Sequence, residues 1–411
     1  MGGLKCRSCG APLEHTFLDL GRAPLANAFL TAADLAQPEV SYPLHVRTCA
    51  RCLLVQLPQV ATPEKIFGHY VYFSSYSESW LQHAEAFARS AVARHRLDSG
   101  SLVMEVGSND GYLLQYFVAA GIPVIGVEPA ANVARVAEVK GVRTVNRFFG
   151  RQAAIEITEQ HGRADLLVGN NVLAHVPDLN DFVAGLAAAL KPAGVLAVEF
   201  PHLLRLMLEN QFDTIYHEHF CYFSLHAVEQ VFRRHGLQVF AVDELATHGG
   251  SLRVHASPSA DGTHPEEASV QRVRDLERAH GLDRVETYAG FASGPLEVRQ
   301  RLPEMLRDER RKGGAVVAYG AAAKGNTLLA YCGIGSDLVD YVVDRNPHKQ
   351  GLYLPGSRIP VFGPEKLRET RPSLVLVLPW NLLDEILGQL AYVREWGGRF
   401  LVPIPRPRIV P

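Results

Sequence analysis

The middle of the chain alternates short apolar runs with stretches of helical period. "SLVMEVGSNDGYLL" at 101–114 passes from a β-forming run through a glycine turn into a helical pattern. "GIPVIGVEPA", "ADLLVGNNVLAHV" and "LKPAGVLAVEFP" supply three further strands. Strands that alternate with helices build a parallel, doubly wound sheet. The pattern therefore predicts a Rossmann-like α/β domain here.

The C-terminal part repeats this arrangement. A charged stretch of helical period at 261–312 indicates amphipathic helices, and "GGAVVAYGAAAKGNTLLAYCGI" then predicts a strand, a small-residue turn and a helix. "LVDYVVDRNPHKQGLYLPG" and "PSLVLVLPWN" add two more strands. A chain of 411 residues is too long for one core. We expect a zinc-binding module at 1–66 and two α/β domains, at 67–260 and 261–411.

Composition and charge exclude several classes of protein. Apolar residues make up 47% and charged residues 20%, as in soluble globular proteins. A net charge of -2 argues against broad nucleic-acid binding. No apolar stretch approaches the roughly 18 residues of a membrane span, and "MGGLKCRSCG" lacks the apolar core of a signal peptide. We expect a cytoplasmic protein without nucleic-acid or membrane partners.

Four of the six cysteines form two C-x-x-C pairs, "CRSC" and "CARC". Two such turns complete a tetrahedral set of four sulfurs, which zinc prefers. The 39 residues between the pairs exceed the usual spacing of roughly 15–20, so they must carry structure of their own. Two disulfides are disfavoured, because the cytosol keeps thiols reduced. A redox-active cysteine pair would explain one C-x-x-C sequence and leave the other unexplained. The sequence predicts structural zinc on Cys6, Cys9, Cys49 and Cys52, with Cys221 and Cys332 as buried thiols.

The glycine turn after the first strand indicates the cofactor. It follows an acid in the pattern E-x-G-x-x-x-G, and a second acid, Glu128, stands 21 residues after Gly107, where it can take both ribose hydroxyls of an adenosine. An acid beside the turn would repel a pyrophosphate and suits a cationic, amino-acid-bearing ligand. The order of motifs resembles class I methyltransferases that use S-adenosylmethionine, with "KPAG" in place of the usual K-P-G-G turn. The expected cofactor residues are Glu105, Gly107, Asn109, Gly111, Glu128, Asn170 and Asn171.

The segment "FDTIYHEHFCYF" at 212–223 concentrates ionisable and aromatic side chains shortly after the strand "VEFP". His217 and His219 would share one face of a strand, but a catalytic metal usually needs a third protein ligand. Aromatic packing of a loop is the plain alternative. Catalysis explains the segment better, because histidine titrates near neutral pH and Glu218 can raise the basicity of a neighbouring imidazole.

The four-cysteine module combined with "EVGSNDG", "NVLAHV", "YHEHFCYF" and "HGGSLR" resembles the sugar C-methyltransferases of deoxysugar biosynthesis. These enzymes act on nucleotide-linked 4-keto-6-deoxyhexoses, and the resemblance extends over nearly the whole chain. It implies that the family's Tyr-x-Glu-His pattern holds the active site, with His219 as base. The implied catalytic residues are Tyr216, Glu218, His219, His175 and Tyr70 or Tyr72.

The chemistry agrees with these residue types. A carbon next to a ketone is acidic enough for an enzymatic base, and the resulting enolate attacks the methyl group of the sulfonium. C3 is favoured as the target and C5 is the alternative, while the separate roles of Tyr216, Glu218 and His175 stay open.

The resemblance also implies that the C-terminal domain anchors the nucleotide diphosphate of the sugar, and we expect this nucleotide to be thymidine diphosphate (TDP). A helix N-terminus beside Lys324 is a good phosphate site. Arg253 of "HGGSLR" could reach the same diphosphate, although a plain salt bridge would explain it equally well. The expected substrate residues are Lys324, Asn326, Arg253, Tyr222, Trp380 and Asn381, in a monomer or small homo-oligomer.

Three alternatives remain at this point. A methyltransferase for another small molecule would have no obvious need for the second α/β domain. An NAD-dependent oxidoreductase would require G-x-G-x-x-G, which neither glycine turn provides. A zinc module that binds nucleic acid or protein is disfavoured by the near-neutral charge and by the absence of a Lys/Arg-rich patch near the cysteines.

Overall fold

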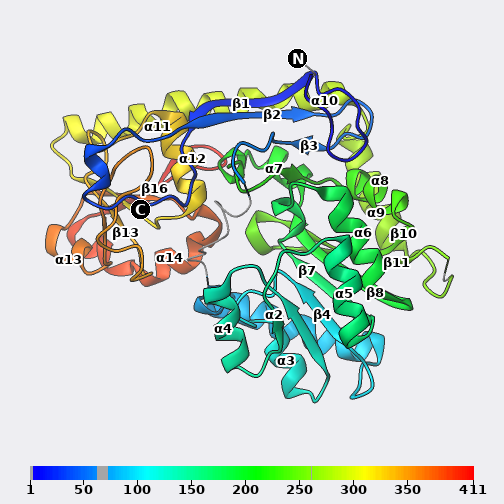
Figure 1. Cartoon of the computed structure of the whole chain (residues 1–411). Helices are drawn as coiled ribbons and strands as arrows, with labels where there is room; N and C mark the ends of the chain where they lie inside the picture. The colour runs from blue at the N-terminus through cyan, green and yellow to red at the C-terminus, as the bar shows by residue number, and fades with distance from the viewer. Residues whose placement is uncertain (1–2, 63–72, 261) are drawn as a thin grey trace. The chain divides into compact units, whose positions relative to one another are not determined.

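The computed structural model describes residues 3–62, 73–260 and 262–411. The described chain divides into two compact units that interleave along the sequence (Figure 1). The first unit comprises Met1–Glu14, Cys49–Leu203 and Phe220–Arg284, and the second comprises His15–Thr48, Leu204–His219 and Val285–Pro411. Neither unit is a continuous stretch of chain. The three domains expected from the sequence, at 1–66, 67–260 and 261–411, are continuous stretches, and their boundaries stay a prediction.

A seven-stranded sheet forms the centre of the first unit, in the order β10-β11-β8-β7-β4-β5-β6. The five strands from β8 to β6 run parallel, whereas β11 is antiparallel to both β8 and β10. The doubly wound core is therefore confirmed, and an antiparallel strand is inserted beside it. The strands are β4 (Val103–Val106), β5 (Val124–Val127), β6 (Thr144–Val145), β7 (Ala164–Asn170), β8 (Leu190–Pro201), β10 (Leu237–Leu245) and β11 (Ser251–Pro258).

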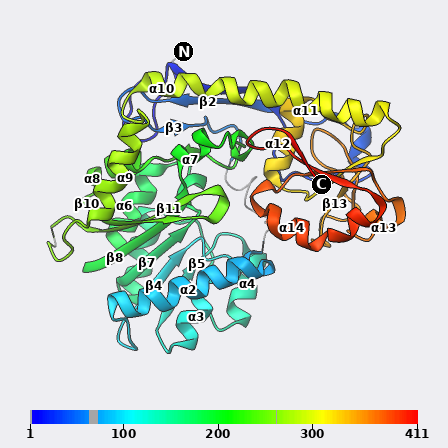
Figure 2. The ribbon, with the colours of Figure 1, turned by 180° about the vertical axis from the view of Figure 1, so that it is seen from behind.

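Helices cover both faces of this sheet because its strands are apolar on both sides. Along β7, Leu167 faces the core that also holds side chains of α5, α6, α8 and α9. Leu166 and Val168 face the opposite core, which also holds side chains of α2 and α3. Figure 2 shows these two helices beside the sheet. The helices are α2 (Glu78–His95), α3 (Leu114–Ala119), α4 (Ala131–Val139), α5 (Arg151–His161), α6 (Leu179–Ala189), α8 (Leu225–Arg234) and α9 (Ala268–Ala279).

The second unit contains the second α/β sheet, in the order β14-β13-β12-β15-β16-β17. Its strands run parallel except β17, which is antiparallel to β16. The strands are β12 (Val316–Tyr319), β13 (Val342–Val343), β14 (Val361–Phe362), β15 (Leu374–Val377), β16 (Arg399–Val402) and β17 (Arg408–Val410). The helices are α7 (Leu203–Leu208), α10 (Val285–Ala289), α11 (Ser293–Arg311), α12 (Ala323–Cys332), α13 (Lys366–Thr370) and α14 (Leu383–Gln389).

The long segment between the two cysteine pairs does carry structure. β1 (His15–Ala23) and β2 (Tyr42–Thr48) pair antiparallel within the second unit. Phe17 of β1 stacks on Phe291 at a ring separation of 4.8 Å and meets Tyr288 edge-on at 6.3 Å. In the first unit the short strands β3 (Val55–Gln56) and β9 (Cys221–Tyr222) pair antiparallel. Among the described residues, no helix combines the length and apolarity needed to cross a membrane.

Candidate functional site

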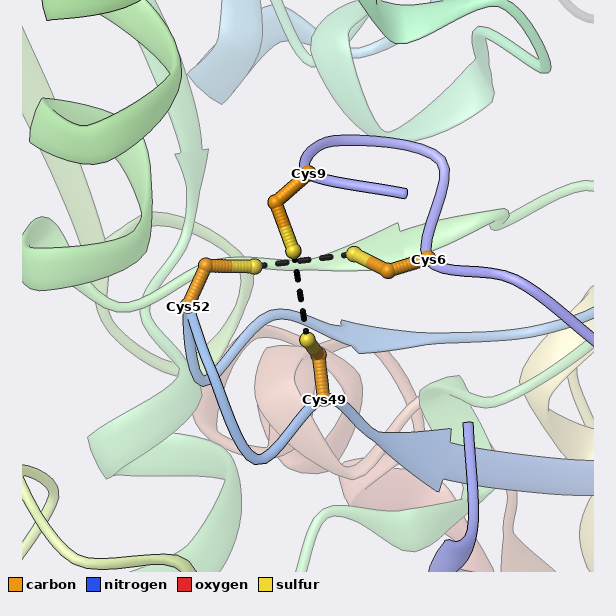
Figure 3. A group of neighbouring side chains, drawn as sticks. All are labelled: Cys6, Cys9, Cys49 and Cys52. Atoms are coloured by element: carbon orange, nitrogen blue, oxygen red, sulfur yellow. Dashed lines mark hydrogen bonds between the residues drawn. The ribbon is translucent and has the colours of Figure 1, made fainter. Parts of the chain in front are cut away.

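The four predicted zinc ligands converge in the first unit (Figure 3). Their sulfur atoms all lie within 4.8 Å of one another, and the Cys6–Cys52 and Cys9–Cys49 sulfurs are each 3.5 Å apart. All six cysteines are free thiols, so the disulfide alternative is wrong, and Cys221 and Cys332 are buried as predicted. Four thiolates at these separations fit a closed, tetrahedral zinc site.

The backbone of each cysteine turn explains this convergence. Gly10 and Leu53, which directly follow the second cysteine of each pair, both have positive φ, 73° and 56°. Their backbone amides also make equivalent hydrogen bonds: Gly10 donates to the Cys6 carbonyl and Leu53 donates to the Cys49 carbonyl, each at 2.9 Å. Each turn thus folds back and directs two sulfurs to one point. Leu53 is strained in this conformation, since a side chain disfavours positive φ.

Loss of one ligand should release the metal. We expect one zinc per chain by elemental analysis, and loss of that zinc in Cys49→Ser. The melting temperature should fall by roughly 10 °C or more, because binding energy of a structural zinc is folding energy. Cys332→Ser, a buried thiol outside the cluster, should keep full zinc content; equal loss in both variants would contradict the assignment.

The expected cofactor residues gather at the carboxyl ends of β4, β5 and β7, three neighbouring parallel strands. Gly107 and Gly111 have φ values of 70° and 75°, which favour glycine. A Cβ atom on Gly111 would lie 3.0 Å from the Val142 side chain, so the turn is also closely packed. Open α/β sheets bind ligands at this edge.

Two acids define the polarity of this edge. Glu105 is fully buried, and neither of its oxygens has a hydrogen-bond partner of normal geometry among the described residues. Burial raises the pKa of Glu105 well above its usual range, offset in part by the Tyr112 hydroxyl. A cationic ligand would compensate this carboxylate, whereas a pyrophosphate would not. The residues present therefore fit the amino-acid end of S-adenosylmethionine.

Glu128 follows β5 and accepts hydrogen bonds from the backbone amides of Asn109 at 3.0 Å and Ala130 at 2.9 Å. Each bond uses one lone pair, so the carboxylate can still accept from two ribose hydroxyls. Burial raises the pKa of Glu128, and these two amides oppose the rise. Asn170 donates to the Tyr112 hydroxyl at 3.3 Å, and Asn171 adopts a positive φ of 55°. The sequence pattern missed Tyr112, although it directly follows Gly111.

Arg253 lies in the first unit, on β11, where it is 7% exposed. It donates to Glu199 at 2.8 Å, and its guanidinium carbon lies 4.2 Å from the centre of the Phe87 ring. Burial would raise the pKa of Glu199, but His83 and Arg253 hold it below its usual value. This buried ion pair accounts for Arg253, and its contact with substrate stays a prediction.

The Tyr-x-Glu-His segment lies at the end of the second unit's middle stretch. Nδ1 of His219 lies 2.8 Å from the Thr214 carbonyl oxygen, which can only accept, so Nδ1 carries the proton. In the neutral imidazole the lone pair is then on Nε2. The rings of Tyr216 and His219 lie 4.1 Å apart. His217 is 1% exposed and its Nε2 donates to the Pro43 carbonyl at 3.2 Å. Among the described residues, the four cysteines are the one group of three or more metal-binding side chains, so no third ligand joins His217 and His219 there.

Glu218 has a partner that sequence analysis did not find. Asn27, between β1 and β2, donates its amide to both carboxylate oxygens of Glu218, at 2.7 and 2.9 Å. Burial raises the pKa of Glu218 to about 7, and the Asn27 amide opposes that rise. No pattern in the sequence marks Asn27, because its partner stands 191 positions away. The amide fixes the orientation of the carboxylate and stabilises its charged form.

Three of the predicted substrate residues meet in the second unit, around the first turn of α12. Lys324 donates to Asn381 Oδ1 at 2.7 Å, and its ammonium lies 4.6 Å from the centre of the Trp380 ring. Trp380 donates to Asp213 at 2.7 Å, and Asp213 is fully buried. Burial lowers the pKa of Lys324, and burial raises that of Asp213 to about 6. The α12 N-cap, Ala322, has no side-chain hydrogen bond to cap the helix. A cation beside uncapped amides suits a phosphate.

The remaining predicted residues are placed as follows. Asn326 is buried on α12 and donates to the Ala26 carbonyl at 2.7 Å. Tyr222 is buried on β9, in the first unit. His175 ends the 3₁₀ turn η3 (Leu173–His175) after β7 and is partly exposed. Tyr70 and Tyr72 lie outside the described residues.

Comparisons with known proteins agree with this geometry. Family models match residues 6–67 ("Putative zinc binding domain"), 80–242 ("Methyltransferase domain") and 246–405 ("C-methyltransferase C-terminal domain"). The chain is 41% identical over 406 residues to C-methyltransferase NovU of Streptomyces niveus, covering 99% of this chain and 96% of that protein. It is 30% identical over 112 residues to a ubiquinone biosynthesis O-methyltransferase of Bradyrhizobium sp. (strain ORS 278), covering 27% of this chain and 44% of that one.

Among solved structures, magnesium protoporphyrin IX methyltransferase (ChlM) from Synechocystis PCC 6803 with bound SAM matches 43% of this chain and 78% of its own, at 16% identity. Its TM-score of 0.33 is too low to support an argument. The sheet order, the buried acid at the glycine turn and the family models define an S-adenosylmethionine-dependent methyltransferase with a zinc-binding module. The full-length similarity to NovU shows that the chain belongs to the C-methyltransferase family.

Proposed function

We propose that this enzyme methylates a carbon next to the ketone of a TDP-linked 4-keto-6-deoxyhexose, as a step of deoxysugar and antibiotic biosynthesis. C3 is the proposed target and C5 the alternative. The name of the relative, C-methyltransferase NovU, supports carbon as the acceptor atom. The observation that carries the proposal is the hydrogen bond between His219 Nδ1 and the Thr214 carbonyl, which places the lone pair of the neutral ring on Nε2.

Within this proposal, His219 Nε2 removes the proton from the carbon next to the ketone. The bound S-adenosylmethionine supplies the electrophilic methyl group. The enolate carbon forms the new C–C bond as the sulfonium C–S bond breaks, and the ketone is restored. Tyr216, His175 and Tyr70 or Tyr72 are the proposed donors to the enolate oxygen, and such donors act most strongly when they are held in place beforehand.

Glu218 is proposed to orient the neighbouring imidazole, with Asn27 as its anchor. The nucleotide is proposed to bind the second unit, where Lys324 and the α12 N-terminus take the diphosphate. Trp380, Asn381 and Asn326 are the proposed contacts to the base or sugar. Arg253 and Tyr222 complete the proposed substrate set, and the enzyme is proposed to act as a monomer or small homo-oligomer.

Ligand binding to purified protein tests the proposal. A ligand that binds only the folded state raises the melting temperature by mass action. We expect S-adenosylhomocysteine and thymidine diphosphate each to raise it, and their effects to appear separately. The decisive assay is transfer of a labelled methyl group to a TDP-4-keto-6-deoxyhexose, with the position read by NMR. Stabilisation by S-adenosylhomocysteine without any effect of thymidine diphosphate would favour a different small-molecule acceptor.

The ionisation of Glu218 predicts how stability depends on pH. Its pKa is raised from the usual 4.5 to about 7 in the folded state, so folding favours the protonated form. Its contribution is therefore fully present below about pH 4.5 and is lost as the pH rises through 7. The full shift corresponds to roughly 3 kcal/mol of unfolding free energy. Asn27→Leu should enlarge this loss and extend it to higher pH, because the opposing amide is gone.

Chemical denaturation between pH 4 and 9 measures this effect. Glu218→Gln should flatten the profile between pH 4.5 and 7, and adding Asn27→Leu to it should change the pH dependence no further. A pH profile of Asn27→Leu that parallels the wild type would contradict the coupling between these two residues.

A further inference from the structure

Arg7 stands between two zinc ligands in the turn Cys6-Arg7-Ser8-Cys9. Its guanidinium joins three separate segments of the first unit. Nη1 donates to the carbonyl of Pro177, and Nη2 donates to that of Leu57 at 2.5 Å. The guanidinium carbon also lies 5.3 Å from the centre of the Phe220 ring. This side chain is therefore committed to backbone and aromatic partners, and no carboxylate pairs with it in the described structure.

The three segments that Arg7 joins are also linked to one another. The amide of Phe220 donates to the Ala174 carbonyl at 2.7 Å, and the amide of Leu57 donates to the Phe220 carbonyl at 2.9 Å. Ala174 belongs to η3, whose last residue is His175, and Pro177 follows two positions later. Phe220 directly follows His219 in the chain. Arg7 thus contacts Pro177 directly, after His175, and is linked to Ala174, before His175, through Phe220.

The backbone of Arg7 is held in place by hydrogen bonds around the first cysteine turn. Asn180 of α6 donates to the carbonyls of Arg7 at 2.9 Å and Ser8 at 3.1 Å. The Arg7 amide donates to Gln56 Oε1 at 2.9 Å, and Gln56 Nε2 donates to the Cys6 sulfur at 3.1 Å. A hydrogen bond of this kind orients a metal-bound thiolate. The metal ligand, the turn backbone and the guanidinium therefore form one connected set.

The second cysteine turn offers an internal comparison. Arg51 occupies the turn Cys49-Ala50-Arg51-Cys52, but it is exposed. In the described part of the chain its side chain has no hydrogen bond or ion pair of the kind that Arg7 makes. Both arginines lie between two zinc ligands, but within the described structure only Arg7 binds the carbonyls and the aromatic ring of other segments. Arg51 is therefore a matched control for Arg7.

We propose that Arg7 is a positioning residue for methyl transfer, which fixes the His175 segment and Phe220 against the zinc turn. The zinc module then serves catalysis by holding these segments in place, without taking part in the chemistry. This inference rests on the proposed function for the roles of His175 and His219. Misplacement of a reacting group by about 1 Å can cost roughly 100-fold in rate.

Three variants test it: Arg7→Gln, Arg7→Lys and Arg51→Gln. We expect Arg7→Gln to lower kcat roughly 10- to 100-fold, with unchanged zinc content, unchanged affinity for S-adenosylhomocysteine and little change in KM. The amide of Phe220 should exchange with solvent deuterium faster than in the wild type. Arg7→Lys should restore little of the rate, since lysine cannot bond two carbonyls in a planar fork. Arg51→Gln should match the wild type throughout.

The outcomes separate this inference from the proposed function. If Arg7→Gln leaves both kcat and the Phe220 exchange rate unchanged, the inference is overturned, whatever the substrate proves to be. Faster exchange with unchanged kcat overturns the link to catalysis and also counts against a catalytic His175. If Arg7→Gln loses zinc, the decision passes to Arg7→Lys: full zinc with wild-type kcat overturns the inference, and full zinc with reduced kcat supports it.

Discussion

His219→Asn should retain the fold and the cofactor affinity and lose roughly 10²- to 10⁴-fold in kcat, the range expected for removal of a general base. The asparagine amide can occupy the place of Nδ1 and keep the hydrogen bond to the Thr214 carbonyl. It carries nothing at the place of Nε2. The variant therefore removes the proposed base and preserves the contact that orders the segment.

Two measurements separate this effect from damage to the site. Titration with S-adenosylhomocysteine should give the wild-type Kd, and solvent deuterium should no longer enter the substrate carbon in the absence of the methyl donor. His219→Gln serves as the matched variant, because its amide lies nearer the place of Nε2 and does not reproduce the Thr214 bond. If His219→Asn still exchanged that proton at the wild-type rate, another group would be the base.

Lys324→Met should raise KM for the nucleotide substrate roughly 10- to 100-fold, the value of one or two charge-assisted hydrogen bonds. Methionine is one atom shorter than lysine; it keeps an unbranched apolar stem beside Trp380 and removes the charge. Burial lowers the pKa of Lys324, and a bound phosphate would oppose that lowering and favour the charged form. The affinity for S-adenosylhomocysteine should not change.

Initial rates across substrate concentrations, with and without added thymidine diphosphate, measure this effect. Lys366→Ala changes a partly exposed lysine on α13 that pairs with Glu369, and it should behave as the wild type. A Lys324→Met enzyme with wild-type KM and wild-type inhibition by thymidine diphosphate would remove Lys324 from the substrate site.

Local patterns predicted the parts of the molecule that local physics determines. The glycine turn after β4 needs positive φ at Gly107 and Gly111, and the sequence supplies glycine at both positions. The cysteine spacing likewise predicted the cluster, because each C-x-x-C turn closes on itself. The glycine turn and each half of the cysteine cluster depend on a few consecutive residues.

The sequence could not reveal partners that meet only after folding. Asn27 binds Glu218 from a distant loop, and neither residue carries a pattern that names the other. The sequence left Arg253 as a candidate to bind a diphosphate. In the structure it contacts Glu199 and Phe87, which come from a strand and a helix far away in the sequence. The interleaving of the two units is equally hidden, because no change of composition marks the points where the chain passes from one to the other.

That interleaving has a consequence for synthesis on the ribosome. β1 and β2 emerge early, but the aromatic partners of Phe17, Tyr288 and Phe291, are made about 270 residues later. Because synthesis adds roughly 5–20 residues per second, the apolar face of β1 and β2 stays uncovered for many seconds. The cysteines at both ends of this segment belong to the first unit. Metal capture by the nascent chain would close the segment into a loop during that wait and limit its encounters with other nascent chains.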